Sequence, residues 1–182
     1  YINFDGVTLT GTIATDDATQ NLSRLVANGQ TRDLPASFYT QAERDQLLAA
    51  LNVTYLPYNV NLVTTRPASG TYDMVIVYEC DLSSLCGTAS PKDCGDQDLG
   101  NIAWVDTFAE AVASVAHHAA GEHGHTLGLD FTREVTDVMF PDTLGNSPTA
   151  FTGGAVRYST GCRPMGATQE SHLEVLRTLG PR

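Results

Sequence analysis

The sequence predicts a single α+β domain, residues 1–182, in which a long helix packs against a sheet. Three observations support this fold class: a short apolar run at 72–79, an Ala-rich helical stretch at 107–128, and a closing helical stretch at 168–180. A run such as YDMVIVYE is typical of a strand covered on both faces. The length of 182 residues suffices for one core, or for two small lobes around a cleft.

The first part of the chain predicts strands on either side of one helix. YINFDGVTLTG alternates apolar and polar residues around a turn at Asp5-Gly6, as two strands would. The polar residues 11–34 predict a loop. Apolar residues recur at helical spacing from 37 to 52, which predicts the first helix. NVNLVTT at 59–65 predicts a strand, separated from the apolar run by the turn-forming RPASG.

The remaining elements lie around the long helix. A loop rich in Cys, Gly and Asp is expected at 80–100 and a strand at 101–106. The long helix ends near Gly128, and the chain is then expected to be irregular to about residue 166. The closing helix ends at Gly180-Pro181, a common stop signal. We therefore expect an N-terminal subdomain of about 1–128 and a C-terminal subdomain of about 129–182.

Charge and hydropathy exclude two classes of partner. The net charge is −11, with 21 acidic against 10 basic residues, whereas nucleic-acid binding requires Lys and Arg on the phosphates. No apolar run reaches the ~18 residues that span a bilayer, so no membrane partner is expected. The oligomeric state does not follow from the sequence.

Four cysteines indicate the compartment. Cys80, Cys86 and Cys94 lie close together and Cys162 far away, with no Cys-x-x-Cys pair. An even number of cysteines predicts two disulfides and an oxidising, extracellular environment. All three pairings remain open, and so does the alternative of four free thiols.

The long helix carries a cluster of polar side chains. On a helical wheel His118, Glu122 and His125 fall within about 60° of one another, with Gly121 on the same side. In a His-Glu-x-x-His helix, two histidines at i and i+4 bind a metal, and the Glu acts as general base. Position 121, the i−4 partner of His125, is glycine.

Gly121 is unfavourable for the helix that contains it. A glycine inside a helix costs about 1 kcal/mol relative to alanine. Two explanations compete: another backbone packs closely against this position, or a functional side chain has been lost. The surrounding sequence favours the second explanation.

The segment GEHGHTLGLDFT, followed by DVMFP, resembles the metzincin clan of zinc peptidases. The signature of that clan is His-Glu-x-x-His-x-x-Gly-x-x-His (or Asp), followed by a Met-turn. The resemblance implies that Glu122 is the general base, His125 the second zinc ligand and Met139 the Met-turn methionine. Gly121 stands at the first ligand position and Phe131 at the third.

Strand segments elsewhere extend the resemblance. YINFDGVTLTG, YNVNLVTTRPASGTYDMVIV and GNIAWVDTF look like strands of bacterial secreted metzincins of the reprolysin and matrixin groups. The resemblance implies a twisted mixed sheet packed on the active-site helix, a Met-turn and a C-terminal helix. It also implies secretion, a zinc cofactor, and hydrolysis of a peptide or protein substrate bound in a cleft.

The substitutions at the ligand positions change the functional expectation. A catalytic zinc needs three protein ligands, and only His125 remains, so we expect zinc to be weakly bound or absent and the chain to be impaired or inactive. His118, roughly 5 Å along the helix axis from position 121, and Asp130, one residue short of the third ligand position, are possible replacement ligands. Two alternatives therefore stay open: an active metallopeptidase with unorthodox ligands, and a non-catalytic peptide-binding module.

Other polar residues receive simpler interpretations. His117 and His123 point away from the metal-binding face of the helix and are expected at the surface. Asp93, Asp96 and Asp98 could hold calcium, but their loop lacks the spacing and the final Glu of an EF-hand. A solvated acidic loop is the preferred interpretation.

Overall fold

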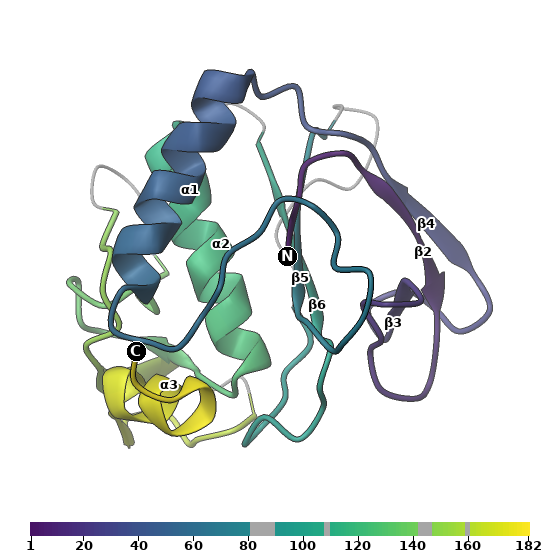
Figure 1. Cartoon of the computed structure of the whole chain (residues 1–182). Coiled ribbons are helices and arrows are strands. Elements are labelled where there is room, and N and C mark those ends of the chain that lie inside the picture. The colour runs from purple at the N-terminus through teal and green to yellow at the C-terminus, as the bar shows by residue number, and fades with distance from the viewer. Residues whose placement is uncertain (81–89, 108–109, 142–146, 159–160) are drawn as a thin grey trace.

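A computed structural model describes residues 1–80, 90–107, 110–141, 147–158 and 161–182. These residues form a small α+β fold with three helices and three small sheets. The helices α1 and α2 lie side by side on one face of the central sheet, and α3 lies near one end of them (Figure 1). The helices are α1 (Gln41–Tyr55), α2 (Val112–Thr126) and α3 (Ser171–Leu179).

The central sheet is parallel and has the strand order β1-β5-β6. Its strands are β1 (Ile2–Asn3), β5 (Met74–Tyr78) and β6 (Ile102–Asp106). Every residue of β5 is buried, which confirms the strand predicted from the apolar run at 72–79. The strand predicted at 59–65 does not form. That segment contacts the sheet through one backbone hydrogen bond, from the Ile2 amide to the Val63 carbonyl at 2.9 Å.

A second sheet covers the other face of the central sheet (Figure 1). Its strands are β2 (Val7–Gly11), β3 (Leu22–Ser23) and β4 (Thr31–Leu34), in the order β3-β2-β4. The loop predicted at 11–34 is therefore wrong for two short segments. Only Leu34 of the four β4 residues is buried, so the strand lacks the apolar alternation that reveals a strand in a sequence. Leu9 and Leu34 pack against Trp104 in a shared core.

The helices begin and end at recognisable signals. The first helix was expected from 37, but it begins after Thr40, whose hydroxyl accepts from the Glu43 amide while the Glu43 carboxylate accepts from the Thr40 amide. The start of the long helix, expected at 107, is later, because the Thr107 amide continues the pairing with β5 by donating to the Tyr78 carbonyl. Residues 108 and 109 lie outside the described residues.

The C-terminal part forms a third, antiparallel sheet where an irregular chain was expected. Its strands are β7 (Phe131–Thr132), β8 (Gly154–Tyr158) and β9 (Thr168–Gln169), and β9 replaces the first turn of the predicted closing helix. A disulfide joins Cys94 to Cys162, and Cys80 is disulfide-bonded as well, so four free thiols are excluded. Cys86 lies outside the described residues. No described helix is long and apolar enough to cross a membrane.

Candidate functional site

His125 lies at the centre of the face of α2 that resembles a metal site. Its side chain is 3% exposed, and its Nδ1 donates to the Leu129 carbonyl oxygen at 2.7 Å. The Nε2 atom of this tautomer carries the lone pair, which is the arrangement that metal-binding histidines use. Burial lowers the pKa of His125, against the opposing effect of Glu122, so the imidazole is neutral at pH 7.

Phe131 occupies the neighbourhood in which the third ligand of a metzincin would stand. Its ring meets the His125 ring edge to face, with the centroids 4.4 Å apart and an interplanar angle of 82°. Phe131 is the first residue of β7, which pairs with β8, so the ring position is set by the sheet. The contact places an apolar ring against His125, the one imidazole that matches a ligand position in the motif resemblance.

Glu122 is held by a residue that the sequence did not single out. The Ser90 hydroxyl donates to Oε2 of Glu122 at 2.6 Å. Lys92 lies in the same loop segment, where the carboxylates of Asp130 and Glu122 counteract the lowering of its pKa by burial. The ammonium group of Lys92 is therefore within electrostatic reach of both carboxylates. Lys92 thus supplies a positive charge in the neighbourhood of Glu122.

The two glycines of α2 have different reasons for being there. A Cβ at Gly121 would meet only the Val138 carbonyl oxygen, at 3.6 Å, which is an ordinary contact. Close packing therefore does not explain Gly121. At Gly124 a Cβ would lie 2.5 Å from Sδ of Met139 and 3.3 Å from the Phe151 ring. Gly124, in contrast, is needed for the close contact between α2 and the fully buried Met139.

The possible replacement ligands are engaged elsewhere. Nδ1 of His118 lies 3.1 Å from a carboxylate oxygen of Glu110. Asp130 is fully buried, and its carboxylate lies 3.8 Å from the guanidinium of Arg163. Among the described residues, no group of three or more His, Cys, Asp or Glu side chains could hold a metal ion. In that part of the chain, the positions that the resemblance assigns to zinc do not offer the three ligands that a catalytic zinc needs.

The prediction that His117 and His123 lie at the surface is wrong. Their exposed fractions are 5% and 9%. Nε2 of His117 lies 3.0 Å from the Phe140 carbonyl oxygen, and Nδ1 lies 3.3 Å from that of Pro148. Burial lowers the pKa of His117. The reason for the error is that α2 is enclosed by α1, the central sheet and the C-terminal part, so it has no solvent-facing side near these residues.

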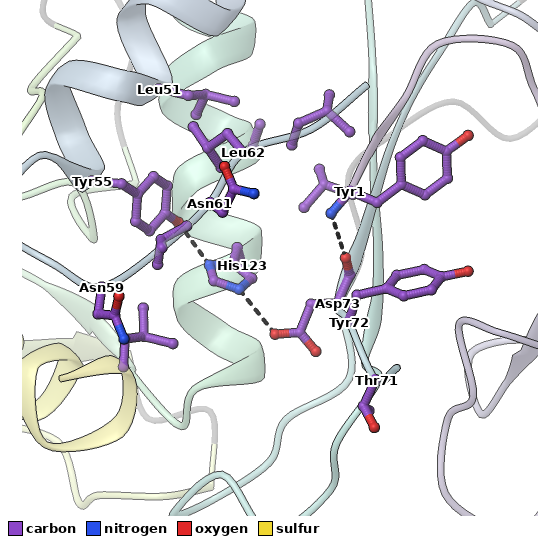
Figure 2. A pocket seen from close by; sticks show the side chains of 15 residues that line it. Tyr1, Leu51, Tyr55, Asn59, Asn61, Leu62, Thr71, Tyr72, Asp73 and His123 are labelled. Atoms are coloured by element: carbon purple, nitrogen blue, oxygen red, sulfur yellow. Dashed lines mark hydrogen bonds and ion pairs between the residues drawn. The ribbon is translucent and has the colours of Figure 1, made fainter. Parts of the chain in front are cut away.

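His123 forms part of a buried hydrogen-bonded chain (Figure 2). Its Nδ1 lies 2.7 Å from the Tyr55 hydroxyl and its Nε2 3.2 Å from a carboxylate oxygen of Asp73. Both contacts are satisfied when Tyr55 donates to Nδ1 and the Nε2–H group donates to Asp73. Burial acts to raise the pKa of Asp73, but the His123 hydrogen bond and charge hold it below its ordinary value.

This chain borders a pocket of about 300 Å³ between the two helices and the central sheet (Figure 2). Leu51, Val75 and Ala119 contribute apolar walls, and Asn61 is among the polar residues that line the pocket. Ala119 is the i−4 neighbour of His123 on α2 and is 1% exposed. Because residues four apart lie on the same face of a helix, the apolar Ala119 is the sequence signal that could have indicated a buried His123.

The acidic loop is stabilised by contacts within the protein. A carboxylate oxygen of Asp93 accepts from the Asp98 amide at 2.6 Å, and Asp98 pairs with Arg24 at 3.2 Å. Asp96 has a φ of 49°, in the left-handed region. Burial, together with the negative charges of Asp73 and Asp93, raises the pKa of Asp96 to about 6. The loop is therefore partly buried, and not freely solvated as the sequence suggested.

No protein-family model matches the chain, and a search of curated proteins finds no match. The resemblance to metzincins therefore depends on the sequence motif and the sequence segments quoted with it.

Gly121→Ala and Gly124→Ala should have opposite effects on stability. The first adds a methyl group where there is room, so we expect the free energy of unfolding to rise by about 0.5–1 kcal/mol. The second forces the new methyl group against Met139, so we expect a loss of about 1–3 kcal/mol. Urea denaturation of both variants measures the difference. A loss of similar size at both positions would contradict the assignment of free space at 121.

Tyr55→Phe should destabilise the fold by about 1–3 kcal/mol, because a buried nitrogen of His123 loses its partner. Tyr158→Phe is the matched control: Tyr158 is 50% exposed, and we expect a change within about 0.5 kcal/mol. Chemical denaturation compares the two. If both variants unfold like the parent protein, the hydrogen bond between Tyr55 and His123 does not contribute to stability.

Asp96→Asn should have little effect below about pH 4, and should stabilise the protein increasingly up to about pH 6 and fully above it. The folded-state pKa of about 6 exceeds the ordinary value of 3.8, so between these values the unfolded chain ionises more readily than the folded protein and the fold loses stability as the pH rises. Asparagine removes that loss and tolerates a positive φ. Denaturation at pH 4 and pH 7.5 measures the change. Asp98→Asn, which removes the Arg24 ion pair, should not stabilise at either pH.

Proposed function

We propose that this chain is a secreted metzincin-like domain that has lost zinc-dependent hydrolysis and binds a peptide or protein segment without cleaving it. The observation that carries the proposal is the edge-to-face contact of Phe131 with His125 at 4.4 Å. At the other substituted position, Gly121 has room for a Cβ atom. Two ligand positions thus hold an apolar ring and a hydrogen atom, while the orienting bond from His125 to Leu129 is kept.

The chemistry of the family needs more than these residues offer. A catalytic zinc lowers the pKa of bound water to about 7 and polarises the scissile carbonyl, and three protein ligands hold it. The described site offers one imidazole. Glu122, the general base implied by the resemblance, accepts a hydrogen bond from Ser90 and faces the positive charge of Lys92.

An active enzyme with unorthodox ligands is less well supported. His118 would have to leave the Glu110 carboxylate, which lies 3.1 Å away. Asp130 would have to turn from Arg163 while its backbone stays fixed by Gln169, whose side chain bonds its amide at 2.8 Å and its carbonyl at 2.9 Å. Both rearrangements break charged or buried contacts, which carries a free-energy cost.

The disulfides support the proposed location. Cys94 is bonded to Cys162 across 68 residues of sequence, and Cys80 is disulfide-bonded as well. Disulfides of this kind persist in oxidising compartments and are rare in the reducing cytosol. Secretion is therefore the location that best fits the cysteine chemistry.

The test is a restoration experiment. Protein purified without chelators should contain no stoichiometric zinc by elemental analysis and should not cleave an unfolded protein substrate. Gly121→His combined with Phe131→His should bind zinc, since it returns two imidazoles to a site whose His125 is already oriented. This variant should then cleave the substrate in a chelator-sensitive manner. Adding Glu122→Ala to it is the control, which should keep the zinc and lose the cleavage.

Two results would contradict the proposal. Stoichiometric zinc in the unchanged protein, with cleavage that Glu122→Ala abolishes, would identify an active enzyme. A restored variant that folds, as judged by circular dichroism, but binds no zinc would remove the metzincin assignment.

A further inference from the structure

A groove of about 480 Å³ lies beside the ring of Phe131, on the C-terminal sheet. The Phe131 and Tyr158 rings meet edge to face at 6.4 Å. The guanidinium of Arg157 lies 5.1 Å from the Tyr158 ring and 5.5 Å from the Phe140 ring. A continuous row of ring contacts therefore leads from His125 into the groove. The lining residues are Arg133, Phe140, Arg157, Tyr158 and Met165.

The charge of the groove is opposite to that of the chain. The net charge is −11, yet the described residues that line the groove include two arginines and no carboxylate. Arg24, Arg44 and Arg163 form ion pairs with carboxylates. Arg133 and Arg157 have no such partner among the described residues. Two guanidinium groups are thus available to an anionic group from outside the chain.

The other groups in the groove favour a peptide over a polyanion. Met165 is 66% exposed and Tyr158 50% exposed, and such side chains adapt to apolar partner residues. A nucleic acid would meet the repulsion of the net charge of −11. β8 is paired on both sides, with β7 and β9, so a partner binds here through side chains and not by adding a strand.

We propose that this groove binds an acidic peptide segment, with Asp or Glu carboxylates on Arg133 and Arg157 and an apolar side chain against Met165. Guanidinium groups bind carboxylates in a bidentate manner, which adds geometric specificity to the interaction. This inference rests on the proposed function, which is peptide binding without cleavage. It adds that the peptide is acidic. Its site lies next to the inherited metal position and needs no metal.

Fluorescence anisotropy tests the assignment with a short labelled peptide that alternates glutamate with leucine and phenylalanine. The neutral reference is the same peptide with glutamine in place of every glutamate. The acidic peptide should bind more tightly, and added salt should weaken it. Arg133→Gln and Arg157→Gln should each weaken binding about two- to fivefold, as expected for exposed ion pairs. Arg177→Gln is the control, because Arg177 is exposed on α3 outside the groove.

Three outcomes would overturn the inference. The first is equal affinity for the acidic and neutral peptides, and the second is equal weakening by Arg177→Gln and the groove variants. The third is a dimer, seen by sedimentation, that the groove variants dissociate, because the occupant would then be a second copy of the chain. Thermal melts confirm that each variant is folded. Cleavage of the peptide would contradict the proposed function and leave the groove assignment standing, so the two failures are distinguishable.

Discussion

The enclosure of α2 is the constraint on which the rest of the structure depends. From Val115 to Thr126 no residue of this helix is exposed, because α1, the central sheet and the segment around Met139 surround it. Each polar side chain on such a helix needs a partner, since an unsatisfied buried group costs about 1–3 kcal/mol. His117 contacts two backbone carbonyls, His123 joins Tyr55 to a carboxylate, and His125 donates to a carbonyl.

The same constraint accounts for the packing around His125. With His125 buried and neutral, a neighbouring position is best filled by an apolar group, and the Phe131 ring fills it. Gly121 leaves a small volume that a methyl group could fill, whereas Gly124 leaves none. A glycine at 121 and a phenylalanine at 131 are therefore compatible with a packed core, because helix and sheet positions are set by contacts outside these two residues.

Some of this could be predicted from the sequence and some could not. The run at 72–79 and the helical spacing in the first helix are local patterns, and both elements are present in the structure. Two-residue strands such as β7 and β9 leave no periodic pattern, because they are formed by pairing with distant residues. The wheel correctly grouped Glu122 with His125, but it misplaced His117 and His123, since it assumes one buried face and α2 has several. Ser90 and Lys92 approach the site through tertiary folding alone.

The loop that carries Ser90 and Lys92 is also held by contacts that involve no charged side chain. Gly128, with a φ of 84°, lets the backbone of Asp93 come so close to the end of α2 that a Cβ would lie 2.8 Å from the Asp93 carbonyl oxygen. The neighbouring Cys94 is covalently joined to Cys162. Because both attachments are at Asp93 and Cys94, the position of the loop beside α2 does not rest on the side chains at 90 and 92 alone. Exchanges there alter the charge beside Glu122 while the loop stays in register with α2.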